Sequence, residues 1–555
     1  MTNREMKHVT RTGQSLTKLH ILGSAKQVTG SMMMFEHVAR DRTIRFLLDV
    51  GLTVENEKAD FQNRLPSGIT PADIDFIIIS HAHIDHSGYL PRLTKLGFAG
   101  PVYTPEASRD LLNIMLPDSG FLQEEAARKN CARAAKLKAA SDTTGGDEHK
   151  VSEKPLARVG KSPRSAAKNS KSPAKPNRSR SKAAICSEPL YTQEDAKHAL
   201  TFIQGKSLNV RYELAPEIAV TFTEAGHILG AAVVNLEFGV GSKKRTFCFT
   251  GNIGRKNMPL LQSVQPVKAA DYVMSESTYG NRLHEVRDRF SILADIINAA
   301  HERAKVKSEK HGYGVILIPA FAVGRSQIVL SDLRQLMDEG RIPRLKVFVD
   351  SPMMIRATEV HRKHKDLLDA QTQALFAEGI DPFRTARQVE TMERTASMAL
   401  DEAQSEPVII VGSSGMASGG RIVNHLKVRL SGRQNTVVFV GYQGTGTLGN
   451  QLIGRDARRH LNGTTIVPTT KEVRTVRIYG EPVKVYAQIE FMSDYSAHGD
   501  YNDIIGWMGK FERKPKQVFL VHGDDEALEA LKGHIETRLR WGVTIPKARQ
   551  VFTLD

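Results

Sequence analysis

The stretch SHAHIDHSG crowds three histidines and an aspartate into six consecutive positions, namely His81, His83, Asp85 and His86. It directly follows the apolar run FIII. In an extended segment alternate side chains project to the same side, so His81 and His83 can bind one metal ion while Asp85 and His86 turn toward a second. A lone histidine beside an apolar run is usually a buried core residue, but this spacing favours metal binding.

Imidazole and carboxylate groups suit zinc, and a catalytic zinc ion has three protein ligands and one open position. Further ligands must therefore come from distant parts of the chain. The candidates are histidines that stand beside glycine just after apolar runs: His227 in AGHILG, His498 in SAHGD and His522 in VHGDD. Each of these alone is weak evidence.

Short apolar runs that alternate with amphipathic segments must position these residues. Runs of this kind predict strands at 19–22, 44–50, 76–80, 218–222, 233–238, 247–250, 315–319, 347–350, 408–411, 437–440 and 518–521. Many of them end in a polar or glycine-rich turn, as in LLDVG and VVFVGYQGTGTLG. This pattern predicts an α/β architecture in which loops at strand ends carry the chemistry.

Length and composition indicate a multidomain protein without a membrane span. A chain of 555 residues exceeds what one hydrophobic core usually supports, and its 40% hydrophobic and 25% charged residues are ordinary for a globular protein. The N-terminus lacks the apolar region of a signal peptide, and three widely separated cysteines give no disulfide framework. We therefore expect a cytoplasmic protein.

The net charge of +16 favours a polyanionic partner, but the charge is unevenly distributed. Residues 151–185 hold ten Lys or Arg residues against one acid, Glu153, so about +9 of the total lies there. This segment has few large apolar residues and repeats Ser-Pro among basic residues, which predicts a disordered insert over about 140–187. It is either a solvated basic linker without a further role or an auxiliary arm that binds RNA or acts as a tether.

The ordered series LLDVG, HAHIDHSG, AGHILG, FTGNIG, ESTYG, SSGMASGGR, SAHGD and VHGD resembles the metallo-β-lactamase superfamily. More narrowly it is similar to the β-CASP branch, which includes RNase J and the endonuclease subunit of the pre-mRNA 3′-end cleavage factor. The resemblance covers nearly the whole chain except the basic insert and the extreme N-terminus. It implies an αββα sandwich at 1–270, closed by 485–555, with an α/β β-CASP cap inserted at 271–484.

The resemblance also implies a ligand set for two zinc ions, for which manganese could substitute. One ion would be held by His81, His83 and His227, and the other by Asp85, His86 and His522. Asp49 would orient the histidine motif from beneath, while Glu276 and His498 would pair near the scissile phosphate. The implied reaction is hydrolysis of RNA that leaves a 5′-phosphate and a 3′-hydroxyl, with Asp85 at the metal and His498 a candidate proton donor to the leaving group.

Glycine-rich turns offer backbone amides and hydroxyl groups to the rest of a nucleic acid. By the same resemblance the candidate substrate-binding residues are Ser413, Ser414, Gly415, Arg421, Arg325 and Thr445. For any single loop, a tight strand-to-helix connection required by packing explains the glycines as well. A homodimer is left open.

One position departs from the family pattern. The family has an aspartate that bridges both zinc ions in a TGDIG-type turn, whereas this chain reads TGNIG, with Asn252 at the bridging position. A neutral amide supplies no negative charge to offset two dications, which predicts weaker binding of at least one metal ion and reduced turnover. The alternatives are a catalytically impaired RNA-binding paralogue, a DNA-acting β-CASP nuclease and a hydrolase of small molecules. His522 favours RNA over DNA, and the long insertion argues against small substrates.

Overall fold

The computed structural model describes residues 16–39, 42–53, 64–143, 186, 188–285, 288–309, 312–454, 458–461, 464–466 and 474–555. Most of the basic insert expected at about 140–187 lies outside these residues. Within the described part, no helix combines the length and the apolar character needed to cross a membrane.

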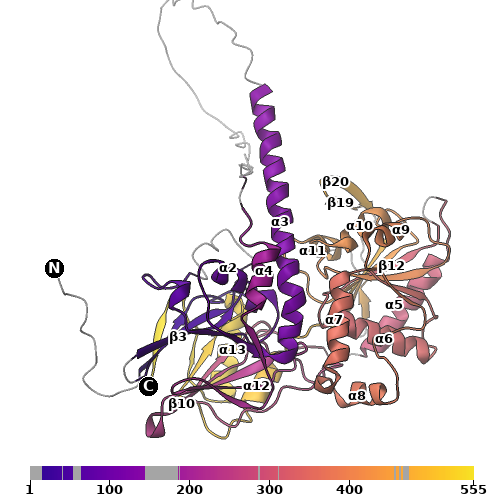
Figure 1. Ribbon diagram of the computed structural model, residues 1–555. Coiled ribbons are helices and arrows are strands. Elements are labelled where there is room, and N and C mark those ends of the chain that lie inside the picture. Colours follow the sequence, from indigo (N-terminus) through magenta and orange to yellow (C-terminus); the bar gives the residue numbers. More distant parts are fainter. Residues whose placement is uncertain are drawn as a thin grey trace, which may run out of the picture.

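Two mixed sheets of seven strands each form the first half of the molecule (Figure 1). The first sheet has the order β24 (Val551–Leu554), β1 (Leu16–Ile21), β2 (Met32–Ala39), β3 (Arg42–Val50), β4 (Phe76–Ile78), β5 (Val102–Pro105) and β6 (Ile203–Lys206). The second has the order β23 (Val543–Thr544), β22 (Gln517–Leu520), β11 (Tyr272–Ser275), β10 (Arg245–Phe249), β9 (Ala232–Phe238), β8 (Ile218–Glu224) and β7 (Arg211–Ala215). The first and the last strand that the structure describes therefore lie side by side in one sheet, where β1 pairs with β24.

The two sheets pack face to face. Phe35 of the first sheet meets Phe247 of the second edge-on, with ring centroids 5.2 Å apart. Alternation along β2 sends Met33 and Phe35 into this inner core, whereas Met32 and Met34 point to an outer core. Both faces of the sheets are thus buried because helices cover the outside: α1 (Ile84–Ser87), α2 (Leu90–Lys95), α3 (Glu106–Thr143), α4 (Gln193–Leu200), α12 (Tyr501–Met508) and α13 (Asp525–Arg538). The expected αββα sandwich is confirmed.

The second half is an α/β domain around a third sheet. Its strand order is β14 (Gln388–Glu390), β13 (Lys346–Val349), β15 (Val408–Gly412), β12 (Val315–Pro319), β16 (Thr436–Val440), β21 (Gln488–Met492), β17 (Arg458–Leu461) and β18 (Thr464–Ile466). The central strands are parallel and wholly buried, as continuous apolar runs predict. Its helices are α5 (Arg289–Ala304), α6 (Arg325–Asp338), α7 (Pro352–Lys363), α8 (Ala370–Ala377), α9 (Arg394–Ala399), α10 (Arg421–Arg429) and α11 (Leu448–Ile453), and β19 (Arg474–Ile478) and β20 (Glu481–Val485) form a separate hairpin.

Sheet membership shifts the domain boundaries expected from the sequence. Strand β11, at 272–275, pairs with β10 and β22 and so belongs to the sandwich rather than to a cap that begins at 271. Strand β21, at 488–492, pairs with β16 and so belongs to the cap rather than to a segment that begins at 485. The chain therefore crosses between the two halves after β11 and again after β21.

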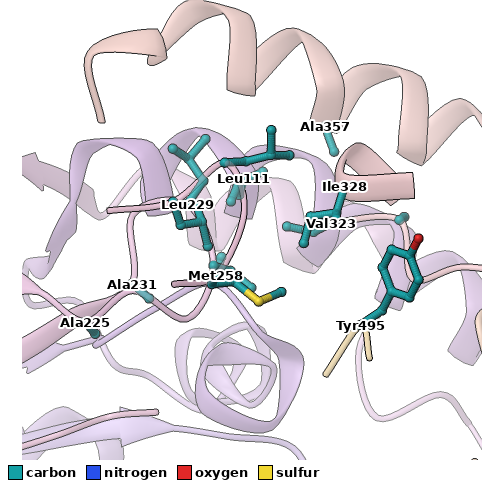
Figure 2. Close-up of a cluster of buried hydrophobic side chains, with 14 of the residues drawn as sticks. Leu111, Ala225, Leu229, Ala231, Met258, Val323, Ile328, Ala357 and Tyr495 are labelled. Atoms are coloured by element: carbon teal, nitrogen blue, oxygen red, sulfur yellow. The ribbon is translucent and has the colours of Figure 1, made fainter. Parts of the chain in front are cut away.

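One continuous apolar cluster joins the two halves. It holds Leu111, Leu229 and Met258 from the sandwich together with Val323 and Ile328 from the cap, all of them buried (Figure 2). Charged groups also join the two halves: Asp110 of α3 accepts hydrogen bonds from Lys363 at 2.6 Å and His364 at 2.8 Å. The cap is thus packed on the sandwich rather than linked only through the chain.

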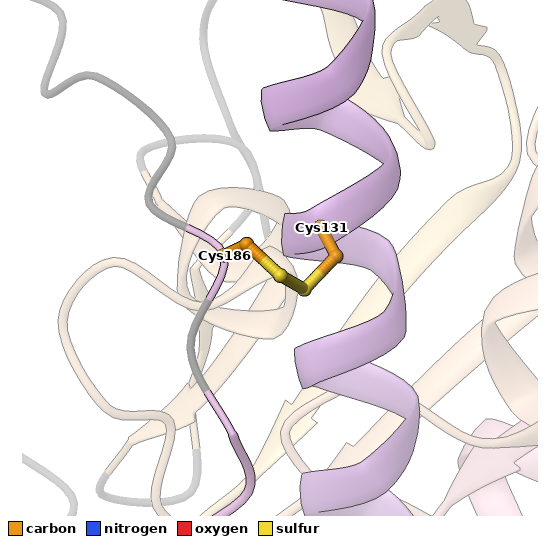
Figure 3. Close-up of a disulfide and its surroundings, with 2 residues drawn as sticks. All are labelled: Cys131 and Cys186. Carbon is orange, nitrogen blue, oxygen red and sulfur yellow. A yellow bond between two sulfur atoms is a disulfide. The ribbon is translucent and has the colours of Figure 1, made fainter.

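Helix α3 extends far beyond the sandwich, and its outer part carries a disulfide (Figure 1). Cys131 on this helix is bonded to Cys186, 55 positions later in the chain (Figure 3). The expectation that the cysteines form no disulfide is therefore wrong. The 55 positions between the two cysteines gave no hint of this pairing in the sequence. Cys248 is free and buried in β10.

Candidate metal centre

The candidate site residues stand at or just after the carboxyl ends of strands. His81 to His86 come after β4, and Asp49 stands near the end of the parallel neighbour β3. In the second sheet, Asn252 follows β10, Glu276 follows β11 and His522 follows β22, and these three strands run parallel side by side. Carboxyl ends of parallel strands share one edge of a sheet, so distant segments converge there.

Three histidines form the first group. His81 Nε2 lies 3.2 Å from His83 Nδ1, and His227 Nε2 lies 3.2 Å from the same His83 nitrogen. Their potential ligand atoms all lie within 4.8 Å of one another. Three imidazole nitrogens that face one point form the donor set that zinc prefers.

An aspartate and two histidines form the second group. His86 Nε2 lies 3.1 Å from His522 Nε2, and His522 Nε2 lies 3.3 Å from Asp85 Oδ2. These atoms also fall within 4.8 Å of one another. The His81 and His86 rings are 4.1 Å apart between centroids, so the two groups are neighbours.

Hydrogen bonds to the other ring nitrogens fix how the histidines point. Ser80 Oγ lies 3.0 Å from His81 Nδ1, and Thr278 Oγ1 lies 3.1 Å from His522 Nδ1. Partners at Nδ1 leave Nε2 of these rings directed at the centre of each group, the arrangement that orients metal-bound histidines.

Asp49 lies beneath the histidine segment and joins it to the strands. Its Oδ2 is 2.6 Å from His86 Nδ1, and its Oδ1 accepts the backbone N–H of Ser80 at 2.8 Å. Ser31 Oγ donates a further bond to Oδ2 at 3.2 Å. The residue is fully buried with a positive φ of 55°, and the bonds to its carboxylate stabilise this uncommon backbone conformation.

Burial and neighbouring charges set the protonation of the site. Burial lowers the pKa of His81 and His227 well below the ordinary value, and it lowers the pKa of His83 to about 4. These rings are therefore neutral at pH 7, the form that binds metal. Burial would raise the pKa of Asp85, but the adjacent His86 and His522 outweigh it and hold the pKa well below its usual range.

Glu276 and His498 meet beside the metal ligands. Glu276 Oε2 is 2.9 Å from His498 Nδ1, and Glu276 Oε1 accepts the backbone N–H of Ile253 at 2.6 Å. The His498 ring lies 4.5 Å from the His227 ring between centroids. Burial acts to raise the pKa of Glu276, but the charge and hydrogen bond of His498 lower it overall, so the carboxylate is ionised at neutral pH.

Asn252 is buried at the same edge, and its Oδ1 has no hydrogen-bond partner among the described residues. A buried amide oxygen without a partner costs about 1–3 kcal/mol, unless another group such as a metal ion satisfies it. The orphaned oxygen and the two donor groups together fit a metal centre. Because the amide is neutral, this position lacks the negative charge that a bridging aspartate would supply.

These residues open onto a cleft of about 440 Å³ between the sandwich and the cap. Its lining includes His83, Asp85, His227, Asn252, His498 and His522 from the sandwich side and Phe321, Arg325 and Tyr442 from the cap side. Arg325 is packed on the Phe321 ring, 4.5 Å from its centroid, and its Nη1 has no hydrogen-bond partner among the described residues. Among the residues that the structure describes, this cation has no ionic partner, and it faces the metal ligands across the cleft.

The other expected substrate residues do not line this cleft. Ser413, Ser414 and Gly415 form a turn after β15, and Gly415 leaves room for the Phe321 ring. Arg421 donates to Asp350 Oδ1 at 2.9 Å and to two backbone carbonyls, so its guanidinium holds the cap together. Thr445 is exposed on the loop after β16.

Sequence reasoning missed several residues of the site. Ser80 and Thr278 stand inside the motifs SHAHIDH and ESTYG, yet nothing in the motifs shows that they would contact histidine Nδ1 atoms. His284 donates from Nε2 to the His498 carbonyl at 2.7 Å, and no motif marks it. Tyr442 follows a predicted strand in VVFVGYQG, and its aromatic side chain among glycines was the available signal.

Comparison with known proteins agrees with this geometry. Family models match in order along the chain: the metallo-beta-lactamase superfamily at 38–139, the Beta-Casp domain at 326–452 and the Zn-dependent metallo-hydrolase RNA specificity domain at 482–546. A ribonuclease of Thermus thermophilus, TTHA0252, is 30% identical over 536 residues, which cover 94% of this chain and 98% of that protein. The chain belongs to the β-CASP branch of the metallo-β-lactamase superfamily.

More distant β-CASP relatives span the same region. Transcription termination factor FttA of Methanosarcina mazei is 27% identical over 94% of this chain and 69% of its own length. FttA of Methanocaldococcus jannaschii is 27% identical over 92% of this chain and 68% of its own length. The match called the RNA specificity domain contains both His498 and His522, so it covers the part of the β-CASP site that the C-terminal segment supplies.

Proposed function

We propose that this protein is a metal-dependent hydrolase that cleaves RNA phosphodiester bonds with two zinc ions. The observation that carries the proposal is the convergence of two three-residue donor groups beside the Glu276–His498 pair. His81, His83 and His227 would hold one ion, and Asp85, His86 and His522 the other. Manganese would substitute for zinc because the same nitrogen and oxygen donors bind it. The similarity to a protein named as a ribonuclease supports RNA as the substrate.

Two bound zinc ions supply Lewis acidity, which activates water for attack and offsets charge on a phosphate. The side chains of the protein supply the rest. Glu276 holds His498 by its Nδ1, so that the other ring nitrogen is left to give a proton to the departing oxygen. In-line attack with loss of the 3′ oxygen leaves a 5′-phosphate on one product and a 3′-hydroxyl on the other.

Arg325 is suited to hold a substrate phosphate opposite the metal ligands. Burial lowers its pKa to about 10, which still leaves it fully charged at neutral pH. The described residues form no salt bridge to it, while Tyr495 accepts a bond from its Nε through the backbone carbonyl at 3.2 Å. A phosphate oxygen would satisfy the remaining donors and compensate the buried charge.

Asn252 should limit the rate at which this protein cleaves RNA. Its amide can offer one oxygen to one ion but no negative charge to two, so we expect weak retention of at least one zinc ion and slow turnover. A catalytically impaired RNA-binding protein is the alternative that this residue supports. We also propose that a second set of cap residues holds RNA outside the cleft, namely Ser413, Ser414, Gly415, Arg421 and Thr445. A homodimer is a further part of the proposal.

The test compares wild type with Asn252→Asp on matched single-stranded RNA and DNA in zinc or manganese. RNAs labelled at the 5′ or the 3′ end, with and without a 5′-phosphate, separate endonuclease from exonuclease products. We expect RNA cleavage with 5′-phosphate products, little cleavage of DNA, and higher rate and zinc content in Asn252→Asp. Tight RNA binding without cleavage by either protein would establish the binding-protein alternative instead, and preferred cleavage of DNA would establish a DNA nuclease.

A further inference from the structure

Tyr442 presents an aromatic ring to the same cleft that the metal ligands line. It follows β16 in the cap, and 51% of the residue is exposed. The cleft lining places it together with Arg325 and Phe321, opposite His83, Asp85 and His498. The residue is therefore accessible from the cleft, on the side that faces the metal ligands.

The backbone on both sides of Tyr442 is held in place. Gly441 N donates to the Met492 carbonyl at 2.7 Å, and Gln443 Nε2 donates to the Gly415 carbonyl at 2.9 Å. A ring on an ordered backbone with two side-chain torsions loses little conformational entropy when a ligand packs on it. The loop is therefore preorganised for binding.

Gly441 also places the Arg325 cation beside the aromatic residue. Its φ is +98°, and a Cβ at this position would lie only 2.8 Å from Arg325 Cζ. The guanidinium thus packs directly on the backbone that precedes Tyr442. A phosphate held by Arg325 would bring its nucleoside next to the tyrosine.

We infer that Tyr442 is a stacking platform for one nucleobase of the substrate, next to the phosphate that Arg325 holds. The inference rests on the proposed function. Stacking on an aromatic ring is worth about 1–3 kcal/mol per base and tolerates every base, because each has a π-face. It requires a base that is not paired in a duplex, so this subsite would favour single-stranded RNA without reading its sequence.

The test measures RNA affinity by fluorescence anisotropy, with the metal removed so that no cleavage occurs, and cleavage kinetics with zinc in parallel. Tyr442→Ala should weaken binding and raise KM about ten- to a hundredfold, with kcat within about twofold. Tyr442→Phe keeps the ring and should bind like wild type. Tyr479→Ala removes a similarly exposed tyrosine, 62% accessible, from the β19–β20 hairpin and should change neither value.

A series of RNAs with one abasic residue at successive positions locates the stacked base. Wild type should lose affinity at one position, and Tyr442→Ala should be insensitive to the loss there. Equal affinity of Tyr442→Ala and wild type for intact RNA, or an equal abasic penalty in both, would overturn the inference. A Tyr442-dependent base contact without any cleavage would uphold the stacking subsite while refuting the nuclease function, so the two failures are distinguishable.

Discussion

Nδ1 of His498 lies 2.9 Å from Oε2 of Glu276, although 222 positions separate the two residues in the chain. Glu276 is completely buried, whereas 22% of the His498 side chain is accessible from the cleft. The carboxylate therefore fixes one nitrogen of the imidazole, and the other nitrogen is the one that would give a proton to the leaving group in the proposed reaction. The pair thus runs from the buried carboxylate of Glu276 to the imidazole of His498 at the cleft surface.

Removing His498 should slow the chemical step without emptying the metal site. We expect His498→Ala to lower kcat about 10²- to 10⁴-fold at unchanged zinc content, because a positioned proton donor contributes a factor of this size. A substrate with sulfur at the 3′ bridging position needs no proton on its leaving group and should restore most of the rate. An equal loss with oxygen and sulfur leaving groups would exclude His498 as the proton donor.

Asp49 should affect zinc binding through His86, whose ring it orients. Asp49→Asn places a neutral amide 2.6 Å from His86 Nδ1 and should weaken zinc binding about 10- to 100-fold, the usual effect of removing such a partner. Competition with a zinc chelator gives the affinity. Ser31→Ala removes only the 3.2 Å bond to Asp49 and serves as the control, with affinity near wild type expected. Unchanged affinity in Asp49→Asn would refute the positioning role.

The cap should contain a stability element that depends on pH. His425 donates from Nδ1 to Asp401 at 2.6 Å and from Nε2 to Asp350 at 2.7 Å, so it bonds both carboxylates only when charged. Burial opposes that charge, but the two carboxylates outweigh it and raise the pKa of His425 above its ordinary value. Because the pKa of His425 is higher in the folded state than in the unfolded state, its charge stabilises the folded protein. This stabilisation is fully present below the unfolded pKa of ~6.5 and is lost as the pH rises through the folded pKa.

Urea unfolding at pH 6 and pH 9 checks this. The free energy of unfolding of wild type should exceed that of His425→Asn by about 2 kcal/mol or more at pH 6, and by clearly less at pH 9. His361 is also buried, but burial lowers its pKa to about 4, so it is neutral from pH 7 upward. The cost of His361→Asn should therefore be the same at pH 7 and pH 9. A gap for His425→Asn that does not shrink with pH would contradict the charged assignment.

The fold was predictable from the sequence where apolar runs were long and continuous. Each of the eleven strands expected on that basis overlaps a strand of the structure, because fully buried strands such as β12 and β15 leave no polar interruption. Strand β2, with the sequence MMMFEHVA, was missed because methionine is not a strand signal and both of its faces are buried. Strands β17 to β20 were missed because they are polar.

The candidate site was predictable to a different degree for its two halves. The six proposed metal ligands stand in short motifs, and the structure brings them together as two groups. The cap residues were harder to place, because glycine-rich turns look alike whether they bind phosphate or pack: of the six residues expected there, Arg325 alone lines the cleft. Backbone pairing across hundreds of positions, as between β11 and β22, leaves no local trace in the sequence.

The disulfide between Cys131 and Cys186 leads to a prediction that differs from the expectation of a cytoplasmic protein with reduced thiols. After thiols are blocked at the moment of lysis and the protein is denatured, we expect one blockable thiol, Cys248, and two more after reduction. Peptide mapping without reduction should recover Cys131 linked to Cys186. Three thiols before reduction would show that the bond does not form in the cell, as is usual in reducing compartments.

Zinc stoichiometry tests the central claim most directly. Wild type dialysed against excess zinc should hold two ions per chain by elemental analysis, while His227→Ala and His522→Ala should each hold about one, and both variants should lose RNA cleavage. If wild type binds no zinc, or if either variant keeps both ions, the two groups of side chains are not the metal centre on which the proposed nuclease depends.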